Sequence, residues 1–466
     1  MKGYSGWEYK PFYSMDRLQR KDNPFIAALR PGDGCIEVEW YDHKAASHVL
    51  CIEDGNGFSR TVAAESSHVF VEGLENGKTY TFTIKDGDNR CSESRMAGIA
   101  PVVGYPVNYL HPEDTCYDFS GHSLCSPSIL RMKSGTLLTS MDVYQHLRAQ
   151  NLSKIFASYD DGKTWHYQTD LFPCFWGKLF EHKGALYMLS FTTEYGNLMV
   201  GKSTDEGKTW SKPVMLFPGS GNRYCGGPHR APLNIMEQEG RLWAAVDFGT
   251  WEKTGHMSGV LSVPVDADLM DPENWVMSEF LPYDPSWEGA AVGESKGCLE
   301  GNLVLLPDGR FCNFLRYQIQ NCVPNRDRAV LLTIDPQNPE KQLTFYKVID
   351  FMGSLTKFSV TYDAVTERYI ALVNRVIDPK KPMARNVLSL MVSEDAIHWE
   401  FVRDVVDCSA YENATEKIGM QYPDMIIDGE DLLWVQRTAM NNATNFHDSN
   451  YITFHKLEGF RRYIRR

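Results

Sequence analysis

The sequence predicts an all-β protein, a six-bladed β-propeller with a small β-sandwich in front of it. Three observations lead to this fold class. Short apolar runs bounded by Gly, Asp and Asn recur along the 466 residues, whereas long patterns with helical periodicity are nearly absent. One strand–turn–strand unit recurs six times after about Gly121. An eight-residue turn motif follows two of its copies.

The repeated unit consists of an apolar strand, a turn rich in Gly or acidic residues, and a second apolar strand. Its starts are separated by 50, 54, 70, 57 and 65 residues, which leaves room for a four-stranded blade with variable loops. The stretch after Arg437 is expected to close the ring by completing the outer strands of the first blade. The six copies begin at Ser126, Trp176, Arg230, Glu300, Lys357 and Tyr422.

The turn motif reads S-x-D-x-G-x-T-W and occupies residues 158–165 and 203–210, with a degraded copy without Gly at 393–399. Its Ser and Asp side chains can bond the amides of a tight turn, its Gly supplies a positive φ, and its Trp fills space between strands. The motif resembles the Asp-box of sialidase-like propellers, where it is structural. Its Asp residues are therefore not expected to be catalytic.

The region before the propeller has a different pattern. Trp40 in an early strand, and Leu74 followed by Tyr80, resemble the core Trp and the tyrosine-corner region of fibronectin type III modules. The resemblance implies a fibronectin III-like β-sandwich over residues 31–101 that spaces or braces a catalytic domain. Residues 1–30 are then an N-terminal extension, and residues 102–466 form the propeller.

Composition narrows the choice of partners. A formal net charge of -13 argues against nucleic acid and anionic membranes, which need a clustered basic surface. The sequence has no apolar stretch of the ~20 residues that a membrane helix needs and no secretory signal, so a cytoplasmic protein is expected, or a secreted one if a leader has been removed. The eleven cysteines form no CxxC pair, and neither a metal site nor a cofactor is predicted. Oligomeric state is left open.

In a propeller, the positions of residues within the repeat predict which of them surround the central site. The start of the first strand and the end of the second meet at one face of every blade, so residues there surround a central depression. So many ionisable groups in one ring indicate a ligand site. The ring comprises His122, Asp142, Trp176, Glu194, His229, Arg230, Asp247, Glu300, Arg316, Lys357, Arg375, Tyr422, Asp424 and Arg437.

Part of this ring resembles the active site of sialidases. Glu300 and Arg316, at the two ends of EGNLVLLPDGRFCNFLR, resemble the segment that supplies the sialidase Glu and second arginine. Tyr422 in QYPDMIIDGEDLLWV resembles the nucleophile, and Arg385 in RNVLSLMVSED resembles the third arginine. The resemblance implies that Glu300 takes the phenol proton, Tyr422 attacks the anomeric carbon, and the arginines hold a sugar carboxylate. This is sensible chemistry, because a phenol of pKa about 10 needs a nearby carboxylate to become nucleophilic, and Arg forks match carboxylates.

The sequence departs from the sialidase pattern in two places. The first arginine of a Y-R-I-P strand is replaced by HSLCSPSIL, so Arg230 or Lys357 is expected to substitute for it. The acid/base Asp belongs in the loop after the first hairpin, where Asp142 is predicted in preference to His146. The remaining predicted substrate-binding residues are Trp176, His229, Asp424 and Arg437.

These residues predict a retaining glycoside hydrolase that acts on a terminal, acidic sugar of a glycan. A polysaccharide lyase is an alternative, because Tyr or His could remove the proton beside a uronic-acid carboxylate that arginines neutralise. A non-catalytic glycan-binding propeller is a third interpretation, since this fold has many roles.

Overall fold

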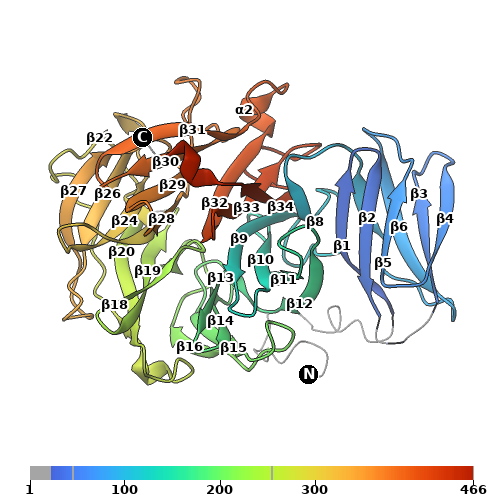
Figure 1. Ribbon diagram of the computed structural model, residues 1–466, viewed down its shortest axis with the longest axis horizontal. Helices are drawn as coiled ribbons and strands as arrows, with labels where there is room; N and C mark the ends of the chain where they lie inside the picture. The colour runs from blue at the N-terminus through green and yellow to red at the C-terminus, as the bar shows by residue number, and fades with distance from the viewer. Residues whose placement is uncertain (1–22, 43, 45–46, 253–254, 465–466) are drawn as a thin grey trace.

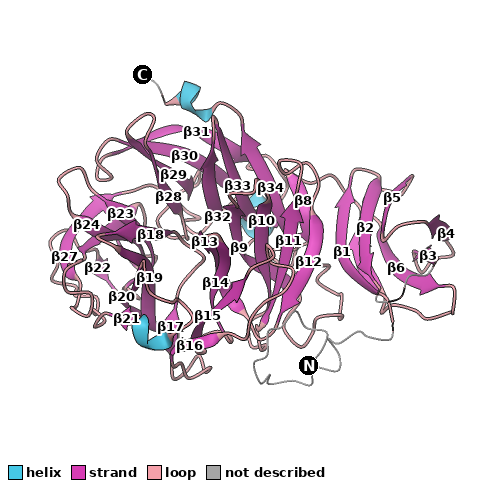
Figure 2. Cartoon of the chain, turned by 60° about the horizontal axis from the view of Figure 1, so that its bottom comes forward, coloured by secondary structure: helices cyan, strands magenta, loops and turns pink. Residues whose placement is uncertain are grey.

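The computed structural model describes residues 23–42, 44, 47–252 and 255–464, and nearly all of its regular structure is β-strand (Figure 2). Six antiparallel sheets form the propeller, and two further sheets lie beside it at the N-terminal end of the chain (Figure 1). Short helical turns within the described residues are η1 (Pro272–Asn274), α2 (Ala414–Lys417) and η2 (Phe460–Tyr463).

The strands of the blades follow the predicted repeat, with the first strand of each sheet innermost. Blade 1 contains β9 (Ser123–Arg131), β10 (Leu137–Tyr144), β11 (Leu152–Ser158) and β12 (His166–Leu171), and blade 2 contains β13 (Phe175–His182), β14 (Ala185–Phe191), β15 (Leu198–Ser203) and β16 (Val214–Phe217). Blade 3 contains β17 (Gly227–His229) and β18 (Ile235–Gln238), which both pair with β19 (Arg241–Thr250), then β20 (Gly255–Pro264) and β21 (Val276–Met277).

The second half of the ring is built in the same way. Blade 4 contains β23 (Cys298–Leu305), β24 (Phe311–Tyr317), β26 (Arg328–Thr333) and β27 (Thr344–Asp350), with β22 (Val292–Gly293) and β25 (Cys322–Val323) as a separate pair. Blade 5 contains β28 (Ser359–Asp363), β29 (Arg368–Asn374), β30 (Val387–Ser393) and β31 (Trp399–Asp407). Blade 6 contains β32 (Gly419–Asp428), β33 (Asp431–Ala439), β34 (Tyr451–Leu457) and β8 (Tyr105–Tyr109).

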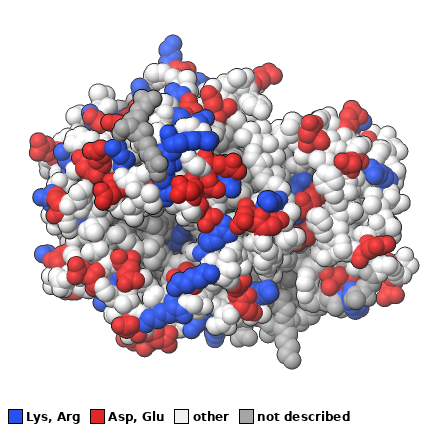
Figure 3. All heavy atoms as spheres, in the orientation of Figure 1, with Lys and Arg blue, Asp and Glu red and all other residues white. Residues whose placement is uncertain are grey.

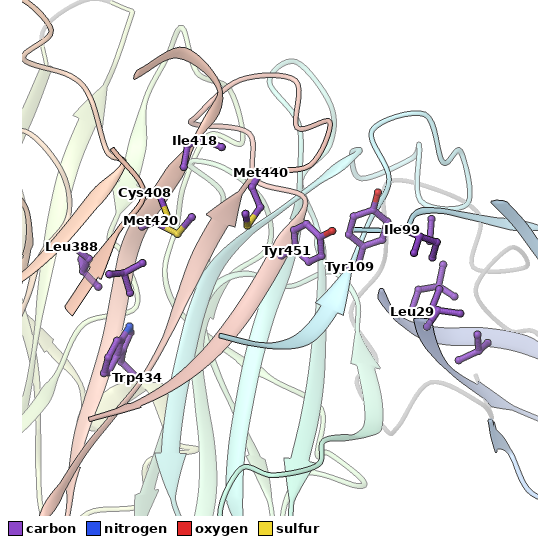
Figure 4. Close-up of a cluster of buried hydrophobic side chains, with 14 of the residues drawn as sticks. Leu29, Ile99, Tyr109, Leu388, Cys408, Ile418, Met420, Trp434, Met440 and Tyr451 are labelled. Atoms are coloured by element: carbon purple, nitrogen blue, oxygen red, sulfur yellow. The ribbon is translucent and has the colours of Figure 1, made fainter. Parts of the chain in front are cut away.

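Blade 6 closes the ring with strands from both ends of the propeller. The prediction that the last stretch completes blade 1 was wrong: β8, from before blade 1, is the outermost strand of blade 6 and pairs antiparallel with β34. The rings of Tyr109 on β8 and Tyr451 on β34 are both buried, with centroids 4.6 Å apart (Figure 4). Pairing the two ends covers an edge that would otherwise be open to other chains.

The turn motifs lie where the third strand of a blade meets the fourth. In blade 1, Gly162 donates its amide to Ser158 Oγ at 2.9 Å, and Thr164 donates its amide to Asp160 Oδ1 at 2.9 Å. The same bonds recur at 2.9 Å in the blade 2 copy, residues 203–210. Trp165 packs into the core that blades 1 and 6 share. Successive strands are antiparallel, so these turns lie at the face opposite the start of the inner strands, away from the predicted site.

The chain before β8 forms a three-stranded and a four-stranded sheet. The first sheet begins at Phe25, within the predicted N-terminal extension rather than at residue 31, and residues 1–22 lie outside the described residues. Trp40, Leu74 and Tyr80 are buried in the core of these sheets, as their pattern indicated. The order is β1 (Phe25–Gly32), β2 (Cys35–Tyr41), β5 (His68–Glu72) in one sheet and β4 (Ser59–Ala64), β3 (His48–Glu53), β6 (Thr79–Asp86), β7 (Arg95–Gly98) in the other.

A buried ion-pair network joins the first of these sheets to the propeller. The Arg30 guanidinium lies 2.6 Å from both Glu37 and Glu39, and its Nε donates to the Val107 carbonyl of β8 at 2.9 Å. Glu39 also accepts the amide of Tyr167 in blade 1 at 2.8 Å. One arginine therefore holds β1 and β2 against both blade 6 and blade 1.

Charges of both signs are mixed on the face of the molecule in Figure 3, where Lys and Arg lie among Asp and Glu. No helix in the described part of the chain is long and apolar enough to cross a membrane.

Substituting Arg30→Ala tests the joint between the sheets and the propeller. We expect a loss of about 3–5 kcal/mol in the free energy of unfolding, because the substitution leaves the buried Glu39 carboxylate without its cation and removes one partner of the half-buried Glu37. Chemical denaturation followed by tryptophan fluorescence measures it. Arg60→Ala, at an exposed arginine of β4, is the control, and equal losses in the two variants would contradict the bracing role of Arg30.

Candidate active site

Four inner strands carry a β-bulge near their start. It directly follows the first residues of the inner strand that pair with the second strand. The register of blades 1, 2, 4 and 6 shows one extra residue on the inner strand there. The first bulge residue has a left-handed backbone, with φ of 49° at Ser126, 50° at Trp176, 54° at Glu300 and 53° at Tyr422. The next residue is Pro or Gly in every case. Non-Gly residues seldom adopt this conformation, and it clusters at functional sites.

The bulges turn these four side chains into one pocket at the centre of the ring. Its volume is about 190 Å³. Loops between the second and third strands of the blades complete the wall, because those loops lie at the same face. The pocket is lined by Ser126, Tyr144, Trp176, Glu194, His229, Ala231, Pro232, Trp251, Glu300, Arg316, Gln318, Arg385, Tyr422, Arg437 and His447.

Glu300, Arg316 and Tyr422 form the centre of the pocket. Arg316 Nη1 donates to Glu300 Oε2 at 2.6 Å and to the phenol oxygen of Tyr422 at 2.9 Å. The phenol and the carboxylate are thus joined through one guanidinium nitrogen. Burial opposes ionisation of Glu300, but Arg316, with smaller contributions from His229 and Arg437, outweighs it and lowers the pKa of Glu300 below its ordinary value.

Two more guanidinium groups surround the same phenol. Arg437 lies 4.0 Å from the centre of the Tyr422 ring and Arg385 lies 5.6 Å from it. Both are buried, and neither has a carboxylate within salt-bridge distance among the residues that the structure describes. Nε of Arg385, and Nε and Nη1 of Arg437, are buried without a hydrogen-bond partner. Burial lowers the pKa of Arg385 to about 10. The pocket therefore holds positive charge that the protein leaves unpaired.

Aromatic side chains line the opposite side of the pocket, on blades 2 and 3. The His229 ring lies 4.4 Å from that of Trp176 and 6.2 Å from that of Trp251, edge to face in both pairs. His229 Nδ1 lies 3.3 Å from Asp247 Oδ2, which fixes the orientation of the imidazole. This side of the pocket is suited to the apolar faces of a sugar ring.

Asp142, the predicted acid/base residue, does not line the pocket. Its Oδ2 accepts the amide of Trp176 at 2.7 Å, and its other oxygen accepts the hydroxyl of Ser153. Asp247 accepts the amide of Glu300 at 2.7 Å in the same way. Burial raises the pKa of Asp142 to about 7. Each aspartate holds the bulge of a neighbouring blade and faces protein, not solvent.

Three of the predicted substrate-binding residues also lie outside the pocket lining. Arg230 donates to the carbonyls of Ala245 and Leu233 at 3.2 Å, and Lys357 donates to the carbonyl of Pro423. Asp424 accepts the amide of Ile129 at 2.8 Å and lies 2.6 Å from Lys178 Nζ. These charges tie the inner strands together behind the pocket. The third guanidinium of the pocket belongs to Arg437, not to Arg230 or Lys357.

The comparisons with known proteins bear on the fold. No protein-family model and no curated protein matches the sequence. Among solved structures, the chain is similar to the Hadza microbial sialidase Hz136, with 12% identity over 93% of each chain and a TM-score of 0.51. It is also similar to the leech intramolecular trans-sialidase, with 10% identity over 94% of this chain and 92% of that one and a TM-score of 0.50.

A third similar structure is a mutant of an α-L-arabinofuranosidase from Fusarium graminearum in complex with an iminosugar inhibitor. Its identity is 14% over 77% of this chain and 97% of that one, with a TM-score of 0.50. The fold is that of a sialidase-like propeller. At these identities the likeness concerns the fold alone.

The sialidase-like propeller places seven predicted residues at its pocket: Trp176, His229, Glu300, Arg316, Arg385, Tyr422 and Arg437. Ser126, Tyr144, Trp251, Gln318 and His447 line it as well and were not among the predicted site residues; nor was Glu194, which appeared only in the wider ring. One signal was present in the sequence, since a residue followed by Gly or Pro near the start of the inner strand marks each bulge.

The bulge in blade 4 can be tested at Gly301. A Cβ there would lie 1.7 Å from Asn313 Oδ1, inside a fully buried side chain, whereas a Cβ at the equivalent Gly177 would meet the sulfur of flexible Met188 at 2.5 Å. We expect Gly301→Ala to reduce the free energy of unfolding by about 1–3 kcal/mol and Gly177→Ala to reduce it less. Urea denaturation measures both. Equal losses would contradict this difference in packing.

Proposed function

We propose that this chain is a retaining glycoside hydrolase that removes a terminal acidic sugar from a glycan, with Tyr422 as its nucleophile. The observation that carries the proposal is the pair of buried guanidinium groups, Arg385 and Arg437, that face the Tyr422 phenol without a carboxylate partner. An unpaired buried charge costs several kcal/mol, so such a site is complementary to an anion. A sugar carboxylate supplies that anion, and Arg forks bind it bidentately.

In the first step, the phenol oxygen of Tyr422 bonds to the anomeric carbon as the bond to the leaving-group oxygen breaks. The phenol proton passes to Glu300, whose lowered pKa keeps it ionised as a base. Arg316 donates to both oxygens and so stabilises the phenolate that develops. Water then displaces Tyr422 from the sugar and Glu300 returns the proton to the phenolate. The departing oxygen takes up one proton to leave as an alcohol and the water gives one up, so protons balance over the two steps, and the two inversions together retain the configuration.

The dimensions of the pocket support action at a chain end. Its volume of about 190 Å³ is below the range of roughly 300–1,000 Å³ that drug-sized ligands occupy. Such a pocket suits one sugar ring at a time. The similar structures are named as sialidases and an arabinofuranosidase, which agrees with a glycosidase of this fold.

We further propose that the seven strands before β8 are a fibronectin III-like sandwich that braces the propeller.

A polysaccharide lyase is the second candidate, and His447 favours it. This histidine lines the pocket, its Nδ1 lies 2.8 Å from Asp448, and burial lowers its pKa to about 4. A neutral imidazole beside two arginines could remove the proton next to a sugar carboxylate. Mass spectrometry of products from a panel of acidic and neutral oligosaccharides separates the candidates. Hydrolysis adds the mass of one water, whereas elimination adds none and creates an ultraviolet-absorbing double bond.

Removing the nucleophile and its base tests the mechanism. We expect Tyr422→Phe and Glu300→Gln each to lower kcat/KM by about 10³-fold or more, because each removes a group that acts only in the transition state. Steady-state kinetics with the best substrate of the panel measures the loss. Tyr362→Phe, at a tyrosine that is 49% exposed and outside the pocket lining, is the matched control. Full activity in Tyr422→Phe would eliminate the tyrosine mechanism, and a wild type that binds glycans without any product would indicate a binding protein.

The arginines can be tested by comparing acidic and neutral substrates. We expect Arg385→Gln and Arg437→Gln to weaken the reaction with acidic sugars by about 10- to 100-fold, since a hydrogen bond to a charged group contributes about 1.5–3 kcal/mol. Activity on a matched neutral glycoside, if present, should not fall. Arg310→Gln, at an exposed arginine, is the control. A loss that is equal for acidic and neutral sugars would contradict carboxylate recognition.

A further inference from the structure

The pocket contains two carboxylates among its described lining residues, Glu300 and Glu194. Glu300 is bonded to Arg316 beside the nucleophile. The other acidic residues of the predicted ring, Asp142, Asp247 and Asp424, each accept a backbone amide from a neighbouring blade. Glu194 is therefore the carboxyl group of this ring that remains for a proton transfer to the substrate.

Glu194 lies across the pocket from the arginines. It belongs to the loop between β14 and β15 of blade 2, on the side of the pocket that Trp176 and His229 line. Its side chain is 15% exposed, so it is largely desolvated but still reaches the pocket. A sugar whose carboxylate lies on the arginines would direct its glycosidic oxygen toward this side.

Arg223 ties together the loops that surround Glu194. Its guanidinium lies 2.8 Å from Glu252 in blade 3, 2.5 Å from His146 Nδ1 in blade 1 and 3.9 Å from Glu194 itself. Gln150 Nε2 also donates to Glu194 Oε2 at 3.3 Å. Loops of three blades therefore hold the carboxyl group through one arginine, which makes Arg223 a positioning residue.

The surroundings of Glu194 make its proton harder to lose than that of an exposed glutamate. Burial raises its pKa above the ordinary value, and nearby positive charge only partly offsets this effect. Glu300, by contrast, has a lowered pKa. Two carboxyl groups with opposite shifts are the arrangement that separates an acid from a base in one site. The titratable groups that face Glu194 are Tyr144, His146, Tyr195, Arg223 and His229.

We propose that Glu194 is the general acid and base of the hydrolysis, the role predicted for Asp142; this inference rests on the proposed function. As the glycosidic bond breaks, the Glu194 proton passes to the departing oxygen, which leaves as a neutral alcohol. The resulting carboxylate then takes a proton from the water that displaces Tyr422, and the acid form is restored.

The test is a set of glycosides of the same sugar with aglycones of graded acidity. An aryl leaving group of low pKa departs without a proton, whereas an alkyl or sugar aglycone needs one. We expect Glu194→Gln to lose about 10²- to 10⁴-fold in kcat/KM on alkyl and oligosaccharide substrates and little on an activated aryl glycoside. Glu181→Gln, at a carboxylate outside the pocket, is the matched control.

The pH dependence of kcat/KM is a second test, because a purely structural role of Glu194 would leave it unchanged. A general acid works only while protonated, so wild-type kcat/KM should fall as the pH rises through the pKa of Glu194, and Glu194→Gln should lack this fall. The charge of Arg223 lowers the pKa of Glu194 in the wild type. Arg223→Gln removes this charge, so the fall in kcat/KM should move to higher pH, and Arg223→Lys should restore the wild-type profile.

The outcomes separate the two proposals. A wild type that hydrolyses the series, with a Glu194→Gln loss that is independent of leaving-group pKa, would overturn the role of Glu194 and leave the proposed function in place. A wild type that produces no hydrolysis product from any acidic glycoside would overturn both.

Discussion

The site depends on one backbone constraint, the left-handed residue that bulges from an inner strand. In a regular strand, the Glu300 and Tyr422 side chains would point to one or the other face of their sheet, because neighbouring side chains alternate between its faces. One extra residue at φ near 50° instead turns both side chains into the central depression. A buried aspartate of the preceding blade bonds the amide of the bulge residue in blades 2 and 4. These hydrogen bonds help to hold the left-handed residues in place.

The electrostatics of the pocket follow from this arrangement. Arg316 and Arg437 occupy the same position in blades 4 and 6, each opposite the residue that precedes the bulge. In blades 1 and 3 the corresponding position holds Asp142 and Asp247. The first pair extends into the pocket beside Tyr422, whereas the second pair bonds backbone. One position of the repeat therefore supplies a pocket-lining guanidinium in two of these blades and a backbone hydrogen bond in the other two.

The fold was largely predictable from the sequence because each blade must bury an apolar inner hairpin, and six such hairpins are visible. The meeting of Glu300, Arg316 and Tyr422 was predictable from antiparallel topology. The sequence did not distinguish residues that line the pocket from residues that are buried behind it, because a single extra residue decides to which face of the sheet a side chain points. Arg230 and Lys357 lie outside the pocket because blade 3 has an interrupted inner strand and the blade 5 strand begins only at Ser359. The strand pattern did place Glu194, just after β14, in the predicted ring, but nothing in the sequence marked it as a catalytic candidate.

The strand that closes the ring has a consequence for synthesis. Because β8 leaves the ribosome before any blade and its partner β34 leaves almost last, β8 waits with an unpaired edge while nearly the whole propeller is made. Arg30 bonds the carbonyl of Val107 on that strand, so the N-terminal sheets, which emerge first, can hold it in place. A chain without these sheets would lack that contact during the wait, and the unpaired edge of β8 would be open to pairing with other chains.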